Sequence, residues 1–367
     1  MILFKTPPDK KKRCKMALEL LRKLISIPSV YGNEKEIADF CENFLKEKNY
    51  NVKRNSNTLL AFKEFNPHKK TVALVGHLDT VPGENEHTGK VINGKLYGLG
   101  ASDMKAGDAV ILKLAEEFSE RDSRYNLLFV LYEKEEGPYE ENGLKPLFEK
   151  EDFREILKKA DFAFVLEPTD NVVQVGCLGV IHAWFVFKGK RAHSARPWEG
   201  ENAIHKGWEL LKKLSETEPK PYTVNGLTYY EVMNATMTDF KGGRNIIPEE
   251  FRVNVNYRFS PTKTLEEAVE DLKRLGEKTG ADEVEFTDLS PAARPCLDNP
   301  ILSEFVEKFG VKVEPKQAWT DVAQLSANGI DAVNFGPGQP HQAHKRNEYV
   351  EIEKVKECYR MLKSFLQ

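Results

Sequence analysis

Apolar residues in the first part of the chain follow two different spacings. In residues 14–27, 33–48 and 104–118 they recur every three or four positions, which predicts three amphipathic helices. Short continuous apolar runs predict buried strands, at 71–76, 126–132 and 161–166. Buried strands that alternate with helices are typical of a parallel sheet covered on both faces.

The middle of the chain has a different order of elements. Its pattern predicts a strand, a helix, two strands, a helix and a short strand, at 180–187, 202–214, 227–240, 251–259, 264–278 and 284–286. Thr264 and Glu267 have the spacing of a capping box at the start of the second helix. This β-α-β-β-α-β order is that of a ferredoxin-like α+β unit.

The first pattern then returns, with helices at 300–309, 322–328 and 352–365 and a strand at 332–335. The ferredoxin-like unit is therefore predicted to interrupt the α/β domain. We expect a discontinuous α/β domain (1–177 and 293–367), with a mostly parallel sheet flanked by helices, and an inserted domain (178–292).

Composition excludes several classes of protein. A hydrophobic fraction of 40% supplies enough apolar surface for real cores, which argues against a disordered chain. The 54 Lys and Arg residues are balanced by 57 Asp and Glu, so a general nucleic-acid-binding role is not expected.

The N-terminal segment, the apolar stretches and the spacing of the cysteines indicate where in the cell the protein is expected. The N-terminal apolar run covers only residues 1–4, which is too short for a secretory signal. The longest uncharged stretch, 171–187, contains Asn, Gln and His, so no membrane span is expected. Five scattered cysteines without a CxxC pair predict a reducing cytoplasm, and they argue against disulfides and against a cysteine-ligated zinc.

Acidic and histidine side chains follow the predicted strands where each one ends. The residues are His77 and Asp79 after the first strand, Glu133, Glu135 and Glu136 after the second, Glu167 after the third, and His341 and His344 beyond the strand at 332–335. Asp103 precedes the helix at 104–118. Ligands bind at the carboxyl ends of strands in open α/β sheets, so these groups are expected to converge.

Each feature has an ordinary alternative. Asp103 could cap its helix, residues 133–141 could form a solvated loop, and a single histidine is more often structural. Convergence from three strands favours a site, because clustered carboxylates repel one another unless a cation lies among them. His341 competes with His344 as the ligand from its loop.

Histidine and carboxylate donors without cysteine suit zinc first, and then cobalt or manganese. Two ions ~3.5–4 Å apart that share a carboxylate form a known hydrolase design. Asp79 lies two residues after His77 and so faces the same way on an extended chain, where it can support that ligand. Glu135 and Glu136 point in different directions, so one can bind metal while the other serves as a base.

Seven motifs, in order along nearly the whole chain, resemble the family of dinuclear-zinc amidohydrolases and exopeptidases. They are GHLDTVPG (76–83), LYGLGASDMKAG (96–107), EEG (135–137), LEPT (166–169), GKRAHSARP (189–197), RNIIPEEFRVNVNYRF (244–259) and FGPG…AHKRNEYV (335–350). The resemblance implies a metallopeptidase-type catalytic domain and an inserted lid that forms a homodimer. Within the family, RAHSARPWEGENAIH, SPAARPCLD and AWTDV are most similar to succinyl-diaminopimelate desuccinylases.

The resemblance also implies roles for individual residues. Asp103 would bridge two metals, with His77 and Glu167 on one ion and Glu136 and His344 on the other. Glu135 would be the general base and acid, and Asp79 would orient His77. His193 and Asn245 would act across the dimer interface on the substrate oxyanion, and Arg258 and Gly336 would contact substrate.

The implied reaction is hydrolysis of an N-acyl amino acid, with succinate removed from N-succinyl-LL-2,6-diaminopimelate in lysine and diaminopimelate synthesis. A water activated by the metals would give its proton to Glu135 and attack the amide carbonyl. Desuccinylases often carry arginines near Gly176 and after Asp321, which this chain lacks. Acetylornithine deacetylase, or another acyl-amino-acid hydrolase or peptidase of the family, is therefore the closest alternative. A metal-containing binding protein without catalysis is the alternative from another class.

Overall fold

The structure is a computed structural model that describes residues 10–367, with side chains from Ala17 onward. The apolar run 1–4 and the side chain of Cys14 lie outside the described residues. The chain divides into two compact units. The first runs up to Val175 and includes Cys296–Glu314 and Gln324–Gln367, and the second contains Gly176–Pro295 and Pro315–Ala323.

The first unit is built on an eight-stranded sheet. Its strands lie in the order β1 (Asn51–Asn55), β2 (Thr58–Phe62), β6 (Asn126–Tyr132), β3 (Thr71–His77), β7 (Phe162–Val165), β16 (Ala332–Asn334), β8 (Val173–Val175) and β15 (Val313–Pro315). The central strands β6, β3, β7 and β16 are parallel, whereas β1, β2 and β8 join by antiparallel pairing. All seven residues of β3 are buried, because both faces of the sheet are covered.

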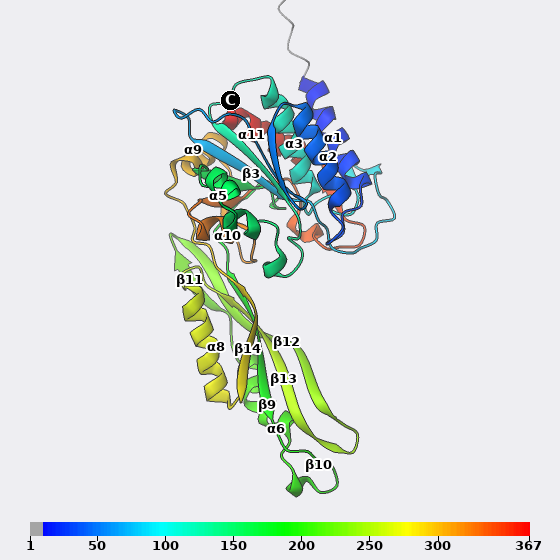
Figure 1. The fold of residues 1–367 in the computed structure, drawn as a ribbon, viewed down its shortest axis with the longest axis vertical. Helices are drawn as coiled ribbons and strands as arrows, with labels where there is room; N and C mark the ends of the chain where they lie inside the picture. The colour runs from blue at the N-terminus through cyan, green and yellow to red at the C-terminus, as the bar shows by residue number, and fades with distance from the viewer. Residues whose placement is uncertain (1–9) are drawn as a thin grey trace, which may run out of the picture. The chain divides into compact units, whose positions relative to one another are not determined.

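Four helices of this unit, α1 (Lys10–Ser26), α2 (Lys35–Glu47), α3 (Lys105–Ser119) and α11 (Ile352–Leu366), pack side by side, with α3 in contact with the other three (Figure 1). The unit also contains α4 (Lys145–Glu149), α5 (Glu151–Leu157) and α9 (Pro300–Phe309), while α10 (Val322–Ala327) begins at the edge of the second unit. A small sheet pairs β17 (Tyr349–Glu351), β5 (Lys95–Tyr97) and β4 (Val91–Ile92). It fixes the segment before Asp103 against the segment after His344.

The second unit is an antiparallel sheet with helices on one face. The strands lie in the order β11 (Lys220–Val224), β12 (Leu227–Gly243), β13 (Ile246–Phe259), β9 (Gly179–Lys188) and β14 (Glu283–Ser290), and β10 (Ala192–His193) pairs with β13. Phe185, Val253 and Tyr257 pack in the core with Leu210 of α7 (Trp208–Ser215) and Leu272 of α8 (Leu265–Thr279). Figure 1 shows α8 lying along this sheet.

The predicted fold class is confirmed: an α/β sheet with a parallel centre and a separate antiparallel sheet in the ferredoxin-like order. The capping box of Thr264 and Glu267 is present. The predicted helix 202–214 is divided into α6 (Ala203–Lys206) and α7 at Gly207, where a side chain would meet the ring of Phe251 at 2.6 Å.

The second unit begins at Gly176 rather than at residue 178, its main stretch ends at Pro295 rather than at residue 292, and it includes one further segment. Residues 315–323 belong to the second unit, although the sequence pattern assigned them to the catalytic domain. Trp319 donates a hydrogen bond to the backbone oxygen of Pro291 at 3.0 Å, and Gln317 bonds to the backbone of Thr228 and Tyr230. These contacts hold the segment to the second sheet. No helix within residues 10–367 combines the length and the apolar character that crossing a membrane requires.

Candidate metal centre

The parallel strands bring the predicted ligands to one edge of the first sheet. In the register of β3 and β6, His77 lies opposite Tyr132, and Glu135 and Glu136 follow within four residues. β7 ends at Val165, opposite Val75, so Glu167 emerges at the same edge. This convergence of three strand ends is what the sequence pattern predicts.

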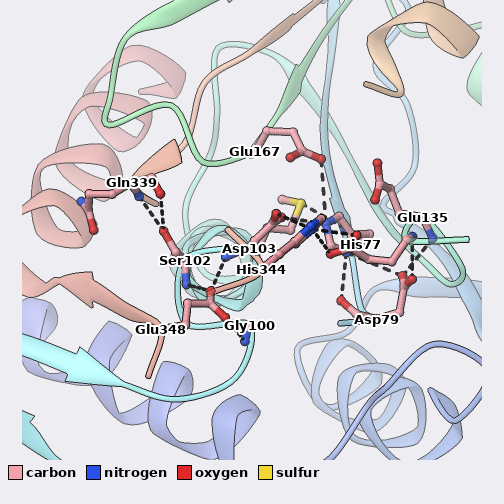
Figure 2. A network of polar contacts seen from close by, with 12 residues as sticks. His77, Asp79, Gly100, Ser102, Asp103, Glu135, Glu167, Gln339, His344 and Glu348 are labelled. Carbon is pink, nitrogen blue, oxygen red and sulfur yellow. Dashed lines mark hydrogen bonds and ion pairs between the residues drawn. The ribbon is translucent and has the colours of Figure 1, made fainter. Parts of the chain in front are cut away.

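The carboxylate of Asp103 lies between two imidazoles (Figure 2). Its Oδ1 is 3.1 Å from Nε2 of His77, and its Oδ2 is 3.6 Å from Nε2 of His344. Nε2 of His344 also lies 2.9 Å from Oε2 of Glu136, and Nε2 of His77 lies 3.9 Å from Oε1 of Glu167. The structure therefore gathers all five residues predicted as metal ligands, with Asp103 at the centre.

The carboxylates make this edge strongly attractive to positive charge. A hydrogen bond with Glu136 raises the pKa of His344 to about 9. Burial alone would lower the pKa of His77, but hydrogen bonds with Asp103 and Asp79 outweigh burial and raise it well above its usual value. A divalent cation provides the same compensating charge without protons on the imidazoles.

The donors fit a divalent metal ion. Ligand atoms of His77, Asp103 and Glu136 lie within 4.8 Å of one another, and the set combines imidazole with carboxylate, which suits zinc, cobalt or manganese. Nδ1 of His77 is 3.0 Å from the backbone oxygen of Asp79. When Nδ1 carries the proton of that hydrogen bond, Nε2 is left as the ligand atom.

Asp79 has a second set of contacts that the sequence did not predict. Its Oδ1 accepts the backbone N–H of Glu135 at 3.0 Å, and its Oδ2 accepts that of Glu136 at 2.9 Å, whereas Oδ1 is 3.6 Å from Nδ1 of His77. Burial raises the pKa of Asp79, but His77 and these amides together lower it below its usual value. Asp79 therefore fixes the loop that carries both glutamates as well as the histidine before it.

Glu348 is a site residue that the sequence pattern did not identify. Its Oε2 accepts the N–H of Gly100 at 2.7 Å, and its Oε1 accepts those of Ser102 at 2.6 Å and Asp103 at 2.9 Å (Figure 2). The residue is 2% exposed, and burial raises its pKa to about 7. In the sequence, only the position of Glu348 in the AHKRNE motif marks it, because the sequence of a polar loop does not show which backbone N–H groups a carboxylate accepts.

Two further predicted positions lie in the first unit. Gly336 follows β16, where a side chain would overlap the backbone oxygens of Leu166 and Glu167. The ring of His341 packs against Tyr349, and the contacts of the ligand cluster are made by His344 instead.

The other predicted residues belong to the second unit. His193 lies on β10 in register with Ile246, and its neighbour Ser194 donates to the backbone oxygen of Asn245 at 2.9 Å, so His193 and Asn245 lie side by side. Arg258 lies on β13, and its Nε donates to Oδ1 of Asn256 at 3.0 Å. The roles of these three residues stay predictions.

An α/β sheet whose strand ends place histidines and carboxylates around a shared aspartate is the framework of a metallohydrolase. Residues 73–367 match the model of peptidase family M20/M25/M40, and the chain belongs to this family of hydrolases. The family resemblance of the motifs is thereby confirmed.

Individual relatives are similar over nearly the full chain. The succinyl-diaminopimelate desuccinylase of Corynebacterium glutamicum is 36% identical over 354 residues, which cover 95% of each chain. A tripeptidase of Staphylococcus aureus shares the fold with a TM-score of 0.78 and 21% identity, over 96% of this chain and 97% of that one. The Bacillus subtilis YXEP protein, described as a dinuclear metal binding peptidase, has a TM-score of 0.73 and 15% identity, over 97% and 98%.

Proposed function

We propose that the protein is a metal-dependent amide hydrolase that releases succinate from N-succinyl-LL-2,6-diaminopimelate. The observation that carries the hydrolase part is the position of Asp103, whose two oxygens face His77 and His344 separately. The substrate part rests on the 36% identity with the Corynebacterium glutamicum desuccinylase.

Five residues would hold two divalent ions, of which zinc is the expected one. His77, Glu167 and Asp103 would hold one ion, and His344, Glu136 and Asp103 the other. When bound, such ions polarise the amide carbonyl and lower the pKa of water toward ~7. The chain itself contributes the geometry, through the strand ends and through the contacts of Asp79 and Glu348.

Glu135 would transfer the proton. Asp79 accepts the backbone N–H of Glu135, and the negative charge of Glu135 is close enough to His77 to help raise the pKa of that imidazole. We infer that its carboxylate takes a proton from the attacking water and returns it to the leaving amine. Glu136, the next residue, contacts His344 and is assigned to metal binding.

The remaining roles fall to backbone and second-unit groups. His193 and Asn245 would donate hydrogen bonds to the oxyanion that develops on the carbonyl, from a second copy of this chain. Arg258 would bind a carboxylate of the substrate, and Gly336 would contact the substrate through its backbone. Partial burial lowers the pKa of Arg258, because burial disfavours the charged form of the guanidinium.

We infer that the partner subunit is a second copy that docks on the second unit. Large apolar side chains are exposed in this unit, at Trp198, Trp208, Met237 and Phe240, with exposed fractions from 53% to 77%. Among the described strands, β12 pairs with β11 only up to Glu231, so its later residues have a free edge on that side. A free strand edge beside apolar surface is suited to pairing with another chain.

The cytoplasm is the location we propose, because the four cysteines whose side chains are described are buried free thiols.

Comparing kcat/KM for N-succinyl-LL-2,6-diaminopimelate and N-acetylornithine, with the protein loaded with zinc, tests the substrate. We expect a strong preference for the succinylated compound. A preference for acetylornithine would assign the protein to the deacetylases and leave the hydrolytic machinery in place. If a protein with its full metal content hydrolyses no acylated amino acid, it is a binding protein.

A further inference from the structure

We propose that His182 and Asn256 are positioning residues that orient the guanidinium of Arg258 toward a substrate carboxylate. The inference rests on the proposed role of Arg258 and deepens it. It assigns a specificity function to His182, a half-buried histidine whose place within a strand suggests only a structural role.

These residues share one face of the second sheet. Val253, Val255 and Tyr257 of β13 point into the core under the helices, so Asn254, Asn256 and Arg258 alternate with them on the opposite face. His182 of β9 lies directly opposite Asn256 in the register. Asn254 is 1% exposed and Asn256 is 9% exposed, so this polar face is buried around them.

The side chains form one continuous series of hydrogen bonds. Nε of Arg258 lies 3.0 Å from Oδ1 of Asn256, and Nδ2 of Asn256 lies 2.7 Å from Nε2 of His182. Nδ1 of His182 and Oγ1 of Thr236 both lie 2.9 Å from Oδ1 of Asn254.

Chemistry fixes the direction of the series. Arginine can only donate, so Oδ1 of Asn256 accepts, and its amide nitrogen must donate to Nε2 of His182. Nε2 is then unprotonated, and the proton of a neutral imidazole is on Nδ1, where it is donated to Asn254. Each member of the series therefore has one role, and Asn256 cannot rotate without losing both of its contacts.

The hydrogen-bond series holds the guanidinium of Arg258 through the neutral amide of Asn256, so the positive charge of Arg258 stays available to a ligand. Among the described residues, no carboxylate forms an ion pair with Arg258, although Asp288, opposite His182 on β14, contributes to its electrostatic surroundings. Arg252, on the same strand and face, is instead paired with Glu285. Anchoring through Nε keeps both Nη atoms for the two oxygens of a carboxylate, the geometry that arginine binds best.

Steady-state kinetics of the zinc-loaded protein test the proposal, with the acylated substrate that wild type hydrolyses. Asn256→Ala and His182→Phe are expected to raise KM about tenfold, the effect of losing an orienting hydrogen bond, with kcat within about twofold. His182→Gln keeps one acceptor and one donor and should restore most of the affinity. Asn256→Ala should add nothing in a protein that already carries Arg258→Ala.

Arg252→Ala is the matched control, because it removes a paired arginine from the same strand, and its KM should stay at the wild-type value. If Arg258→Ala raises KM while Asn256→Ala and His182→Phe do not, the positioning role is wrong and the proposed function stands. If Arg258→Ala leaves KM unchanged, its carboxylate role in the proposed function fails as well. Equal KM for His182→Gln and His182→Phe would also overturn the inference.

Discussion

The carboxylate of Glu348 accepts the backbone N–H of Asp103 at 2.9 Å, although the two residues are 245 positions apart in the sequence. The same carboxylate accepts two further amides of the loop before Asp103. Next to it, Ser102 and Gln339 exchange two hydrogen bonds, Oγ to backbone oxygen at 3.1 Å and backbone N–H to Oγ at 2.6 Å. The loop that carries the central aspartate is thereby fixed to the segment that carries His344.

Glu348→Gln should therefore weaken metal binding although Glu348 is not a predicted ligand. The amide group of glutamine would point a donor at a backbone N–H, so the loop would shift and displace Asp103. We expect metal affinity to fall about 10–100-fold, as for other residues that orient ligands. Competition with a chelator measures it, and Glu351→Gln on the nearby strand β17 is the control. Unchanged metal affinity in Glu348→Gln would show that the hydrogen bonds of Glu348 do not position Asp103.

Asp79→Asn tests the anchoring of the two glutamates. An asparagine retains only one of the two oxygens that accept the amides of Glu135 and Glu136, and its NH2 group would oppose the other N–H. We expect kcat/KM to fall roughly 10–100-fold, together with a loss of metal affinity. If the variant keeps wild-type activity and metal content, the amide contacts are dispensable.

Glu135→Ala separates metal binding from proton transfer. The ligand cluster of His77, Asp103, Glu136 and His344 makes its contacts without this side chain, so the metal content should not change. Loss of a general base and acid should lower kcat by ~10²–10⁴-fold. Elemental analysis and turnover are measured on the same sample, with Glu141→Ala, an acidic residue of the same loop, as the control. Near-normal kcat in a fully metallated variant would remove Glu135 from the role.

His344→Ala should reduce the metal content only in part. His344 contacts Asp103 and Glu136, whereas His77 contacts Asp103 and Glu167, so one of the two predicted ions keeps all its ligands. Elemental analysis should give a lower stoichiometry than wild type but not zero. His341→Ala is the matched control, since that ring packs on Tyr349. An unchanged stoichiometry for His344→Ala would transfer the ligand role elsewhere.

The sequence predicts the fold and the ligand cluster for a physical reason. Parallel strands are continuous apolar runs, and their ends mark the edge where a ligand binds, so the strand pattern places His77, Glu167 and the glutamates at 133, 135 and 136 together. The choice of Glu136 among these glutamates comes from the family resemblance. The weakly apolar strand β1, whose residues are mostly half-buried, lacks that signal, and so do the short strands of the small sheet.

The sequence could not predict contacts between side chains and backbone amides that are distant along the chain. The spacing of His77 and Asp79 predicts that they face the same way, but nothing in it shows that Asp79 accepts the amides of Glu135 and Glu136. The same holds for Glu348, because acceptors of backbone N–H groups leave no periodic pattern. Such contacts depend on which loops meet in space, and that is fixed only by the packed fold.

Gly336→Ala separates a structural need for glycine from a role in substrate binding. The N–H of Gly336 donates to Oγ1 of Thr169 at 3.0 Å, and a methyl group would overlap the backbone oxygens of Leu166 and Glu167. The backbone at Gly336 cannot move away from residues 166–167 without shifting Glu167, so we expect the free energy of unfolding to fall by about 1–3 kcal/mol. Metal affinity should fall with it, as measured by chemical denaturation and by chelator competition. Gly243→Ala, where the nearest atom lies 3.5 Å away, should change neither. A stable, fully metallated Gly336→Ala protein with a raised KM would instead support direct contact of this backbone with substrate.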